Sequence, residues 1–299
     1  MDVIRRQQQP PMRRPIAVIA FGGWNDACDV ASTTAQYIIK SHDETTMFAE
    51  IEPDPFYDFQ QHRPAIEIRD GVSRSMQWPT VSFTAASRLN DDRDVVIVSG
   101  PEPNFRWKTF ARSLVEVLDE IGVEEVILVG AFVGATDHRQ PISLAGVGMD
   151  SVSVIRSGLE AANYIGPTGI VGAVQGACKE AGIRSISLWA ATPPYLSGNP
   201  FPKAVLAMVE KVSDLMNLHI DTSELIAIDA EYTQRVDAAL EDAGSDVNDY
   251  LEEIETYDEP LLGSLTASGH PVDFQPSSLD PEHTDDLVDE IVKFLEGDS

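Results

Sequence analysis

The chain has 299 residues, of which 43% are hydrophobic, so it is long and apolar enough for one large α/β domain with an appendage. Its formal net charge is −28 at pH 7, and residues 221–299 carry most of it, with 23 acidic and 2 basic side chains (net −21). Such a surface repels phosphate backbones and anionic lipids, so neither nucleic acid nor a membrane is an expected partner. The acidic side chains either keep the surface of the helices solvated or face a basic patch on a protein partner.

Residues 1–13, rich in Arg, Gln and Pro, are predicted to form a disordered leader. The apolar run that starts at Ile16 is too short for a signal peptide and lacks a small-x-small cleavage site, so we predict that it forms the first strand. Cys28 and Cys178 are too few to staple a domain of this size, which favours a cytoplasmic protein. The longest apolar run, residues 126–135, is far shorter than the ~18–20 residues of a membrane span.

Short β-branched runs alternate with amphipathic segments through residues 14–220, which predicts a core domain with a mostly parallel sheet between two layers of helices. The expected strands are residues 16–21, 46–51, 95–99, 126–131 and 185–190. The expected helices cover residues 30–40, 105–121, 168–181 and 204–218. Two further extended runs, 65–69 and 80–86, are predicted to form an antiparallel addition to the sheet, joined by the turn dipeptide Asp70-Gly71, and 142–148 is predicted to form another.

Beyond residue 220 the pattern contains helices and no strands. Residues 221–259 are predicted to form an acidic helical region, in which Tyr232, Val236, Ala239 and Leu240 make an apolar stripe. Residues 260–299 are predicted to form a long Gly/Pro/Ser-rich loop followed by a helix that packs on the core or on a neighbouring subunit. The C-terminal part is therefore expected to be a helical appendage to the α/β core.

Polar loops follow several of the predicted strands, where a sheet of this kind binds its ligands. The candidate pocket residues in these loops are Trp24, Asn25, Asp26, Glu102, Trp107, His138, Gly166, Pro167, Thr168, Gly169, Tyr195 and Asn199. The segment Gly166-Pro167-Thr168-Gly169 either cradles an anion or simply begins a helix. His138, next to Asp137, either acts as an acid or base or is a structural residue, and Asn25-Asp26 either present polar groups to a ligand or cap a helix.

The sequence lacks the motifs of the common catalytic classes. It contains no G-x-S-x-G, no G-x-x-x-x-G-K-[ST], no H-E-x-x-H and no C-x-x-C. We therefore expect no metal and no cofactor, and no residue is assigned a catalytic role.

Six segments occur in an order that is similar to the proteasome assembly chaperone two family, in its bacterial and especially actinobacterial branch. They are "FGGWNDACD", "HRPAIEIRDGVSRSMQWP", "EPNFRWKTF", "VILVGAFVGATDHRQP", "YIGPTGIVG" and "PPYLSGNPFPKA". The resemblance implies an α/β/α fold similar to nucleoside phosphorylases, a homotrimer, and a relation to eukaryotic chaperones that help to assemble proteasome α-rings. The sequence departs from the family at His138-Arg139-Gln140-Pro141, where the arginine is displaced, and at Pro193-Pro194-Tyr195, where a histidine is missing.

Two functions follow as hypotheses. The first is a non-enzymatic, homo-oligomeric assembly factor or protein-interaction module, with proteasome subunits as possible partners. The second is a binding protein or enzyme for a small nucleoside-like or anionic molecule, which would use the loops at the carboxyl ends of the strands.

Overall fold

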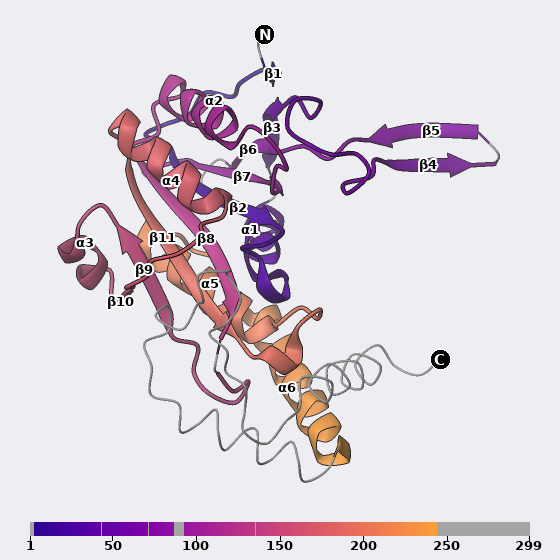
Figure 1. The fold of residues 1–299 in the computed structure, drawn as a ribbon, viewed down its shortest axis with the longest axis vertical. Helices are drawn as coiled ribbons and strands as arrows, with labels where there is room; N and C mark the ends of the chain where they lie inside the picture. The colour runs from indigo at the N-terminus through magenta and orange to yellow at the C-terminus, as the bar shows by residue number, and fades with distance from the viewer. Residues whose placement is uncertain (1–2, 43, 71, 87–92, 135, 244–299) are drawn as a thin grey trace.

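A computed structural model describes residues 3–42, 44–70, 72–86, 93–134 and 136–243 of the chain. The strands of its main sheet are β1 (Ile4–Arg6), β2 (Ile16–Gly22), β3 (Thr45–Ile51), β6 (Ser82–Ala86), β7 (Val95–Pro101), β8 (Glu125–Val133), β9 (Leu144–Gly148), β10 (Glu160–Ala161) and β11 (Arg184–Thr192). They lie in the order β1-β3-β6-β7-β2-β8-β11-β9-β10 (Figure 1). The five strands predicted for the sheet are confirmed, with ends that differ by at most two residues.

The four strands at the centre of the sheet, β7, β2, β8 and β11, run in the same direction. On one side β6, β3 and β1 are added in antiparallel pairs, and on the other side β9 pairs antiparallel with β11 and parallel with β10. The run at 142–148, predicted as an addition, is β9. The carboxyl ends of the central strands therefore meet at one edge of the sheet, which is where a ligand site is expected.

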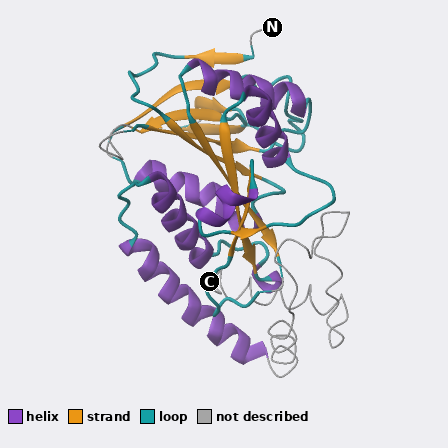
Figure 2. Ribbon diagram, turned by 90° about the vertical axis from the view of Figure 1, so that its left-hand side faces the viewer, coloured by secondary structure: helices purple, strands orange, loops and turns teal. Residues whose placement is uncertain are grey.

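Helices cover both faces of the sheet (Figure 2). Helices α1 (Val30–Lys40) and α5 (Pro202–Met216) pack on one face, and α2 (Trp107–Glu120) and α4 (Ile170–Ala181) pack on the other. Alternate residues of β2 point to opposite faces, so Val18 lies in the core under α1 and α5 while Ile19 lies in the core under α2 and α4. The predicted three-layer α/β/α class is confirmed.

Two helices lie outside this arrangement. The short helix α3 (Ser151–Arg156) packs beside β9, and α6 (Ser223–Ala243) packs on α5 through the predicted stripe that includes Val236 and Leu240. Helix α6 is thus the first part of the predicted acidic helical region, whose remainder lies outside the described residues, as does the predicted loop and helix at 260–299. In the described part of the chain, none of the helices is long and apolar enough to cross a membrane.

The N-terminal leader differs from the prediction, because Ile4–Arg6 forms β1 and pairs with β3 through Ile4↔Ile51. The Ile4 side chain is buried, and the Arg5 guanidinium donates hydrogen bonds to the Glu52 carboxylate at 3.0 and 3.2 Å. The prediction of disorder is therefore wrong for these residues. The strand holds one apolar side chain followed by two arginines, so its sequence pattern carries too little signal for a strand.

The run at 65–69 is the strand β4 (Ala65–Arg69), but its partner is β5 (Val72–Gln77) and not the run at 80–86. Asp70, in the left-handed region at φ 52°, belongs to the turn between them. The two strands form a separate sheet that projects from the body as an arm (Figure 1). The run at 80–86 contributes β6 to the main sheet instead, so the predicted turn is in place and the predicted pairing is wrong.

Candidate functional site

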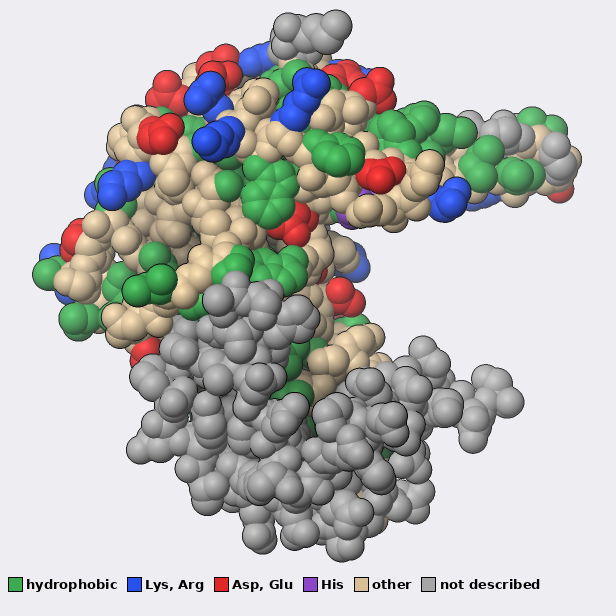
Figure 3. All heavy atoms as spheres, viewed as in Figure 1, with side chains coloured by type: hydrophobic (Ala, Val, Ile, Leu, Met, Phe, Trp, Pro, Cys, Tyr) green, Lys and Arg blue, Asp and Glu red, His purple; other side chains and the backbone are tan. Residues whose placement is uncertain are grey.

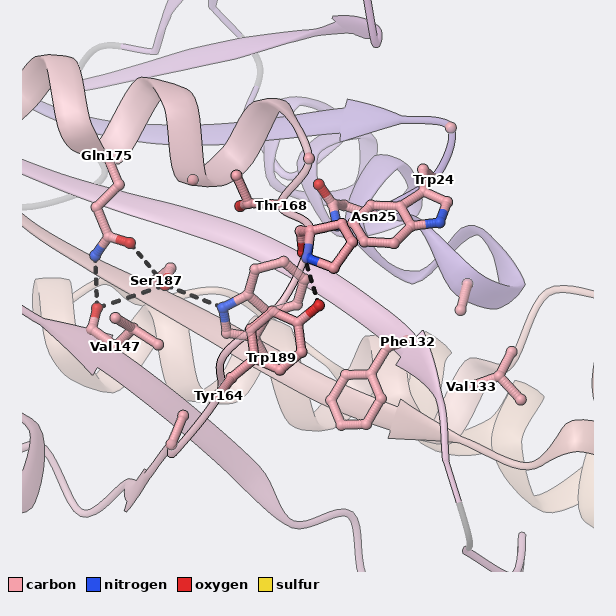
Figure 4. A pocket seen from close by; sticks show the side chains of 16 residues that line it. Trp24, Asn25, Phe132, Val133, Val147, Tyr164, Thr168, Gln175, Ser187 and Trp189 are labelled. Atoms are coloured by element: carbon pink, nitrogen blue, oxygen red, sulfur yellow. Dashed lines mark hydrogen bonds between the residues drawn. The ribbon is translucent and has the colours of Figure 1, made fainter. Parts of the chain in front are cut away.

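A cavity of about 530 Å³ opens at the edge of the sheet where β2 and β8 end, next to the start of α4 (Figure 4). Its volume falls in the ~300–1,000 Å³ range of small-molecule sites. It is lined by Gly23, Trp24, Asn25, Ala27, Phe132, Val133, Val147, Ala162, Tyr164, Pro167, Thr168, Gly169, Gly172, Gln175, Ser187 and Trp189. None of these residues carries a charged side chain, so any ligand of the cavity is bound by aromatic surface and neutral polar groups.

Trp189 is held in place from two sides. Its indole lies over Gly130 of the neighbouring strand β8, where a Cβ would come within 2.6 Å of the ring. Its Nε1–H donates a hydrogen bond to Ser187 Oγ at 3.0 Å. Only a glycine at position 130 leaves room for the indole to lie against the strand, so the sheet itself fixes this wall of the cavity.

The polar groups beside Trp189 already bond to one another. Gln175 Nε2 donates to the carbonyl oxygen of Val147 at 2.6 Å, and Ser187 Oγ lies 3.3 Å from Gln175 Oε1 (Figure 4). The Tyr164 hydroxyl donates to the carbonyl oxygen of Pro167 at 2.7 Å. These groups shape the cavity, and most of their hydrogen-bonding capacity is taken up by other groups of the protein.

Asn25 differs from them. Its backbone carbonyl oxygen accepts a hydrogen bond from Ala131 N–H at 2.8 Å, which ties the β2–α1 loop to β8. Its side chain is 5% exposed, and the amide oxygen has no hydrogen-bond partner among the described residues. A Cβ at position 169 would collide with that oxygen, so Gly169 allows the start of α4 to approach Asn25 closely.

Asp26 serves the local structure of the loop. One of its carboxylate oxygens accepts hydrogen bonds from the backbone N–H groups of Ala31 at 2.6 Å and Ser32 at 3.1 Å, in the first turn of α1. Burial raises the pKa of this carboxyl, and the hydrogen bonds from Ser32 and Ala31 oppose that rise. Two alternatives were open for Asp26, and the structure agrees with the second: its carboxylate caps the N-terminal turn of α1.

Glu102 lies behind the rim of the cavity and connects its two sides. One carboxylate oxygen accepts a hydrogen bond from Trp24 N–H at 3.3 Å, and the other accepts one from Ile170 N–H, the first residue of α4, at 2.9 Å. A protein carboxylate thus sits at the positive end of α4. The N–H group of Ile170, which directly follows the predicted anion cradle at Gly166–Gly169, is therefore already hydrogen-bonded to a carboxylate.

His138 and Tyr195 form a second, closed cluster that does not line this cavity. The His138 ring is buried, with Nδ1 2.8 Å from the Tyr195 hydroxyl and Nε2 3.2 Å from Asp237 Oδ1 of α6. Burial by itself raises the pKa of Asp137, but hydrogen bonds from the His138 ring and Arg139 N–H outweigh it and leave the pKa below its usual value. This cluster joins α6 to the end of β8.

The twelve predicted pocket residues thus separate into groups. Trp24, Asn25, Pro167, Thr168 and Gly169 line the cavity, while Asp26 and Glu102 support the loops around it. His138 and Tyr195 belong to the cluster under α6.

Trp107, Gly166 and Asn199 line neither site. Trp107 Nε1–H donates to the carbonyl oxygen of Pro103 at 2.6 Å, and Asn199 N–H donates to that of Leu196 at 3.1 Å. Gly166 is exposed and lies against the Tyr164 ring.

Sequence reasoning missed Phe132, Tyr164, Gln175, Ser187 and Trp189. They come from within strands and a helix, or from the extended segment before α4, and not from the loops that follow strands. The available signal is the pair Ser187 and Trp189, a hydroxyl and a large ring on the same side of one strand. In the ranges that the structure describes, no group of three or more His, Cys, Asp or Glu side chains could hold a metal ion.

The fold and the cavity define a class of three-layer α/β/α protein with a mixed sheet, a projecting hairpin and an uncharged aromatic cavity at the carboxyl edge. The model of the PAC2 family matches residues 20–240, and the chain belongs to that family. The predicted family is thereby confirmed. No curated protein matches the chain.

Two solved structures of actinobacterial proteins resemble the chain in sequence and fold. A PAC2 family protein from Streptomyces avermitilis is 38% identical, with a TM-score of 0.71, over 79% of this chain and 99% of that one. A proteasome-assembly chaperone homologue from Mycobacterium tuberculosis is 34% identical, with a TM-score of 0.68, over 83% of this chain and 98% of that one. Pyrococcus furiosus PbaB, described as an archaeal proteasome activator, shares the fold at 18% identity and a TM-score of 0.62, over 78% of this chain and 97% of that one.

Proposed function

We propose that this protein is a non-enzymatic, homo-oligomeric assembly factor of the cytoplasm that binds other protein chains, with proteasome subunits as the first partners to test. Support comes from the family and from the Mycobacterium tuberculosis relative, which is named as a proteasome-assembly chaperone homologue at 34% identity. A trimer is the oligomer that the family resemblance favours.

The observation that carries the proposal is the projecting arm, β4 and β5. Ile66, Ile68, Val72 and Met76 are each between 50% and 61% exposed, and Ile66 lies directly opposite Met76. Figure 3 shows hydrophobic side chains along the projecting arm. Apolar side chains gathered on an exposed two-stranded ribbon are typical of a surface that another protein covers.

The chemistry of the described residues favours a binding role over catalysis. Burial raises the pKa of the Cys28 thiol to about 11 and that of the Cys178 thiol to about 12, so neither is a ready nucleophile near neutral pH. His138, the histidine beside Asp137, is enclosed by Tyr195 and Asp237 and reaches no open cavity among the described residues.

The test uses purified proteasome α subunits from the same organism and the double variant Ile66→Glu/Ile68→Glu. The matched control is Gln77→Glu, which adds a negative charge to the same arm opposite Ala65. We expect the parent and the control to bind the α subunits and the double variant to bind at least about tenfold more weakly, with unchanged melting temperatures, because β4 is not part of the main sheet. Light scattering should give a mass of about three chains of 32.7 kDa for the parent.

Equal binding by the double variant and the parent would remove the arm from the interface. A parent that binds none of the purified subunits, or that stays monomeric, would overturn the corresponding part of the proposal.

A further inference from the structure

We propose that the cavity beside Asn25 binds a neutral, planar nitrogen heteroaromatic molecule of about the size of a nucleobase or nicotinamide. The inference is independent of the proposed assembly function, because it depends on the cavity alone. It narrows the small-molecule hypothesis, since it excludes anionic ligands.

The walls of the cavity favour a flat aromatic ligand. Trp24, Phe132, Tyr164 and Trp189 all face it, and no two of these rings stack on each other among the described residues (Figure 4). Trp189 cannot easily turn aside, because Gly130 and Ser187 hold its indole in place. Rings that are fixed and unstacked offer their faces to a planar guest, and such stacking depends on the shape of the guest and not on its charge.

Asn25 supplies the directional contact. The residue is 5% exposed, and its amide oxygen has no hydrogen-bond partner among the described residues. A buried amide oxygen without a partner is uncommon in proteins and costs stability, so it calls for an explanation. Because the amide oxygen packs against Gly169, the NH2 group is the part of the Asn25 amide that can serve a ligand in the cavity, and an unprotonated ring nitrogen is a suitable acceptor for it.

The electrostatics select a neutral molecule. The lining contains no Lys or Arg that could pair with a phosphate or carboxylate. The Glu102 carboxylate lies behind the rim, 2.9 Å from Ile170 N–H, so the helix terminus that could attract an anion is already compensated. An anion in the cavity would lose its hydration and meet a negative charge, which opposes binding.

The test measures binding of three neutral probes, adenine, nicotinamide and adenosine, by ligand-observed NMR, with AMP and choline as the anionic and cationic counterparts. Thr168 lines the mouth, is exposed and makes no hydrogen bond among the described residues, so Thr168→Phe should fill the entrance without disturbing the fold. Thr46→Phe, at an exposed position of β3, is the matched control. Asn25→Ala removes the unpaired amide.

We expect at least one neutral probe to bind with a Kd below about 1 mM, and AMP and choline to bind at least about tenfold more weakly. Thr168→Phe and Asn25→Ala should each weaken binding by about tenfold or more, and Thr46→Phe should leave it within about twofold. Asn25→Ala should also keep or raise the melting temperature, because an amide without partners does not stabilise the fold.

The following results would overturn the proposal. The first is that none of the neutral probes binds more tightly than about 10 mM. The second is that AMP or choline binds as well as the neutral probes. The third is that Thr168→Phe and Thr46→Phe have the same effect, or that Asn25→Ala lowers the melting temperature and leaves binding unchanged.

Discussion

Removing the Glu102 carboxylate should destabilise the edge of the sheet that forms the cavity. Glu102 accepts hydrogen bonds from Trp24 N–H at 3.3 Å and from Ile170 N–H at 2.9 Å, so it connects the loop after β2 to the start of α4. In Glu102→Ala both donors lose their partner and the N-terminus of α4 loses its negative charge. In Glu102→Gln one oxygen can still accept a hydrogen bond, but the other is replaced by an NH2 group, so the charge and one of the two hydrogen bonds are lost.

The magnitude follows from these contacts. Loss of a cap at a helix N-terminus costs about 0.5–2 kcal/mol, and loss of a charge that interacts with the helix dipole costs about 0.3–1 kcal/mol. We therefore expect Glu102→Ala to lower the free energy of unfolding by about 1–3 kcal/mol, and Glu102→Gln, which loses the charge and one hydrogen bond, by about 0.8–2.5 kcal/mol. With an m-value of about 3 kcal/mol per M, the urea midpoint of Glu102→Ala should fall by about 0.3–1 M.

Urea titrations followed by circular dichroism measure these differences. Glu180→Ala, at the opposite end of α4, removes the same charge from an exposed position where the helix dipole disfavours an acid, so it should change stability by less than about 0.5 kcal/mol. If Glu102→Ala and Glu180→Ala shift the midpoint equally, the bridging role of Glu102 is refuted. A Glu102→Gln variant as stable as the parent would show that neither the charge nor the second hydrogen bond contributes to stability.

Two further changes test the packing and the charges. Gly130→Ala should lower the free energy of unfolding by about 1–3 kcal/mol, because its Cβ would meet the Trp189 ring at 2.6 Å. Gly176→Ala in α4, where a Cβ would have nothing within 4 Å, should raise the free energy of unfolding by about 0.5–1 kcal/mol. Urea midpoints that move in the same direction for both variants would contradict this. For Asp237, burial acts to raise the pKa, but hydrogen bonds from Arg139 and His138 outweigh it and bring the pKa below its usual 3.8. The ionised carboxylate therefore stabilises the fold above pH ~4, and this contribution is lost as the pH falls through the folded-state pKa. Asp237→Asn should therefore make the urea midpoint less dependent on pH between about 5 and 2, and a dependence as steep as in the parent or in the exposed control Glu231→Gln would show that the prediction is wrong.

Much of the layered core could be predicted from the sequence, because its signals are local. A strand such as β2 is buried on both faces and is apolar throughout, and the helices that cover it repeat apolar residues every three or four positions. The arm shows where local signals fail. The turn at Asp70 was recognised, but β5 holds only Val72 and Met76 as large apolar residues and has no alternation, so the more apolar run that became β6 was chosen as the partner.

The cavity could be predicted only in part. Parallel strands end at the same edge of a sheet, so the sequence alone placed Asn25, Thr168 and Gly169 near one another. It could not show that Glu102 occupies the start of α4, or that His138 turns away toward Asp237 of α6. The periodicity of a sequence determines which face of an element is buried, but the distance between side chains far apart in the chain is determined by how the layers pack. Only the tertiary structure decided which polar groups bond to one another and which buried atoms, the Asn25 amide oxygen among them, have no hydrogen-bond partner among the described residues.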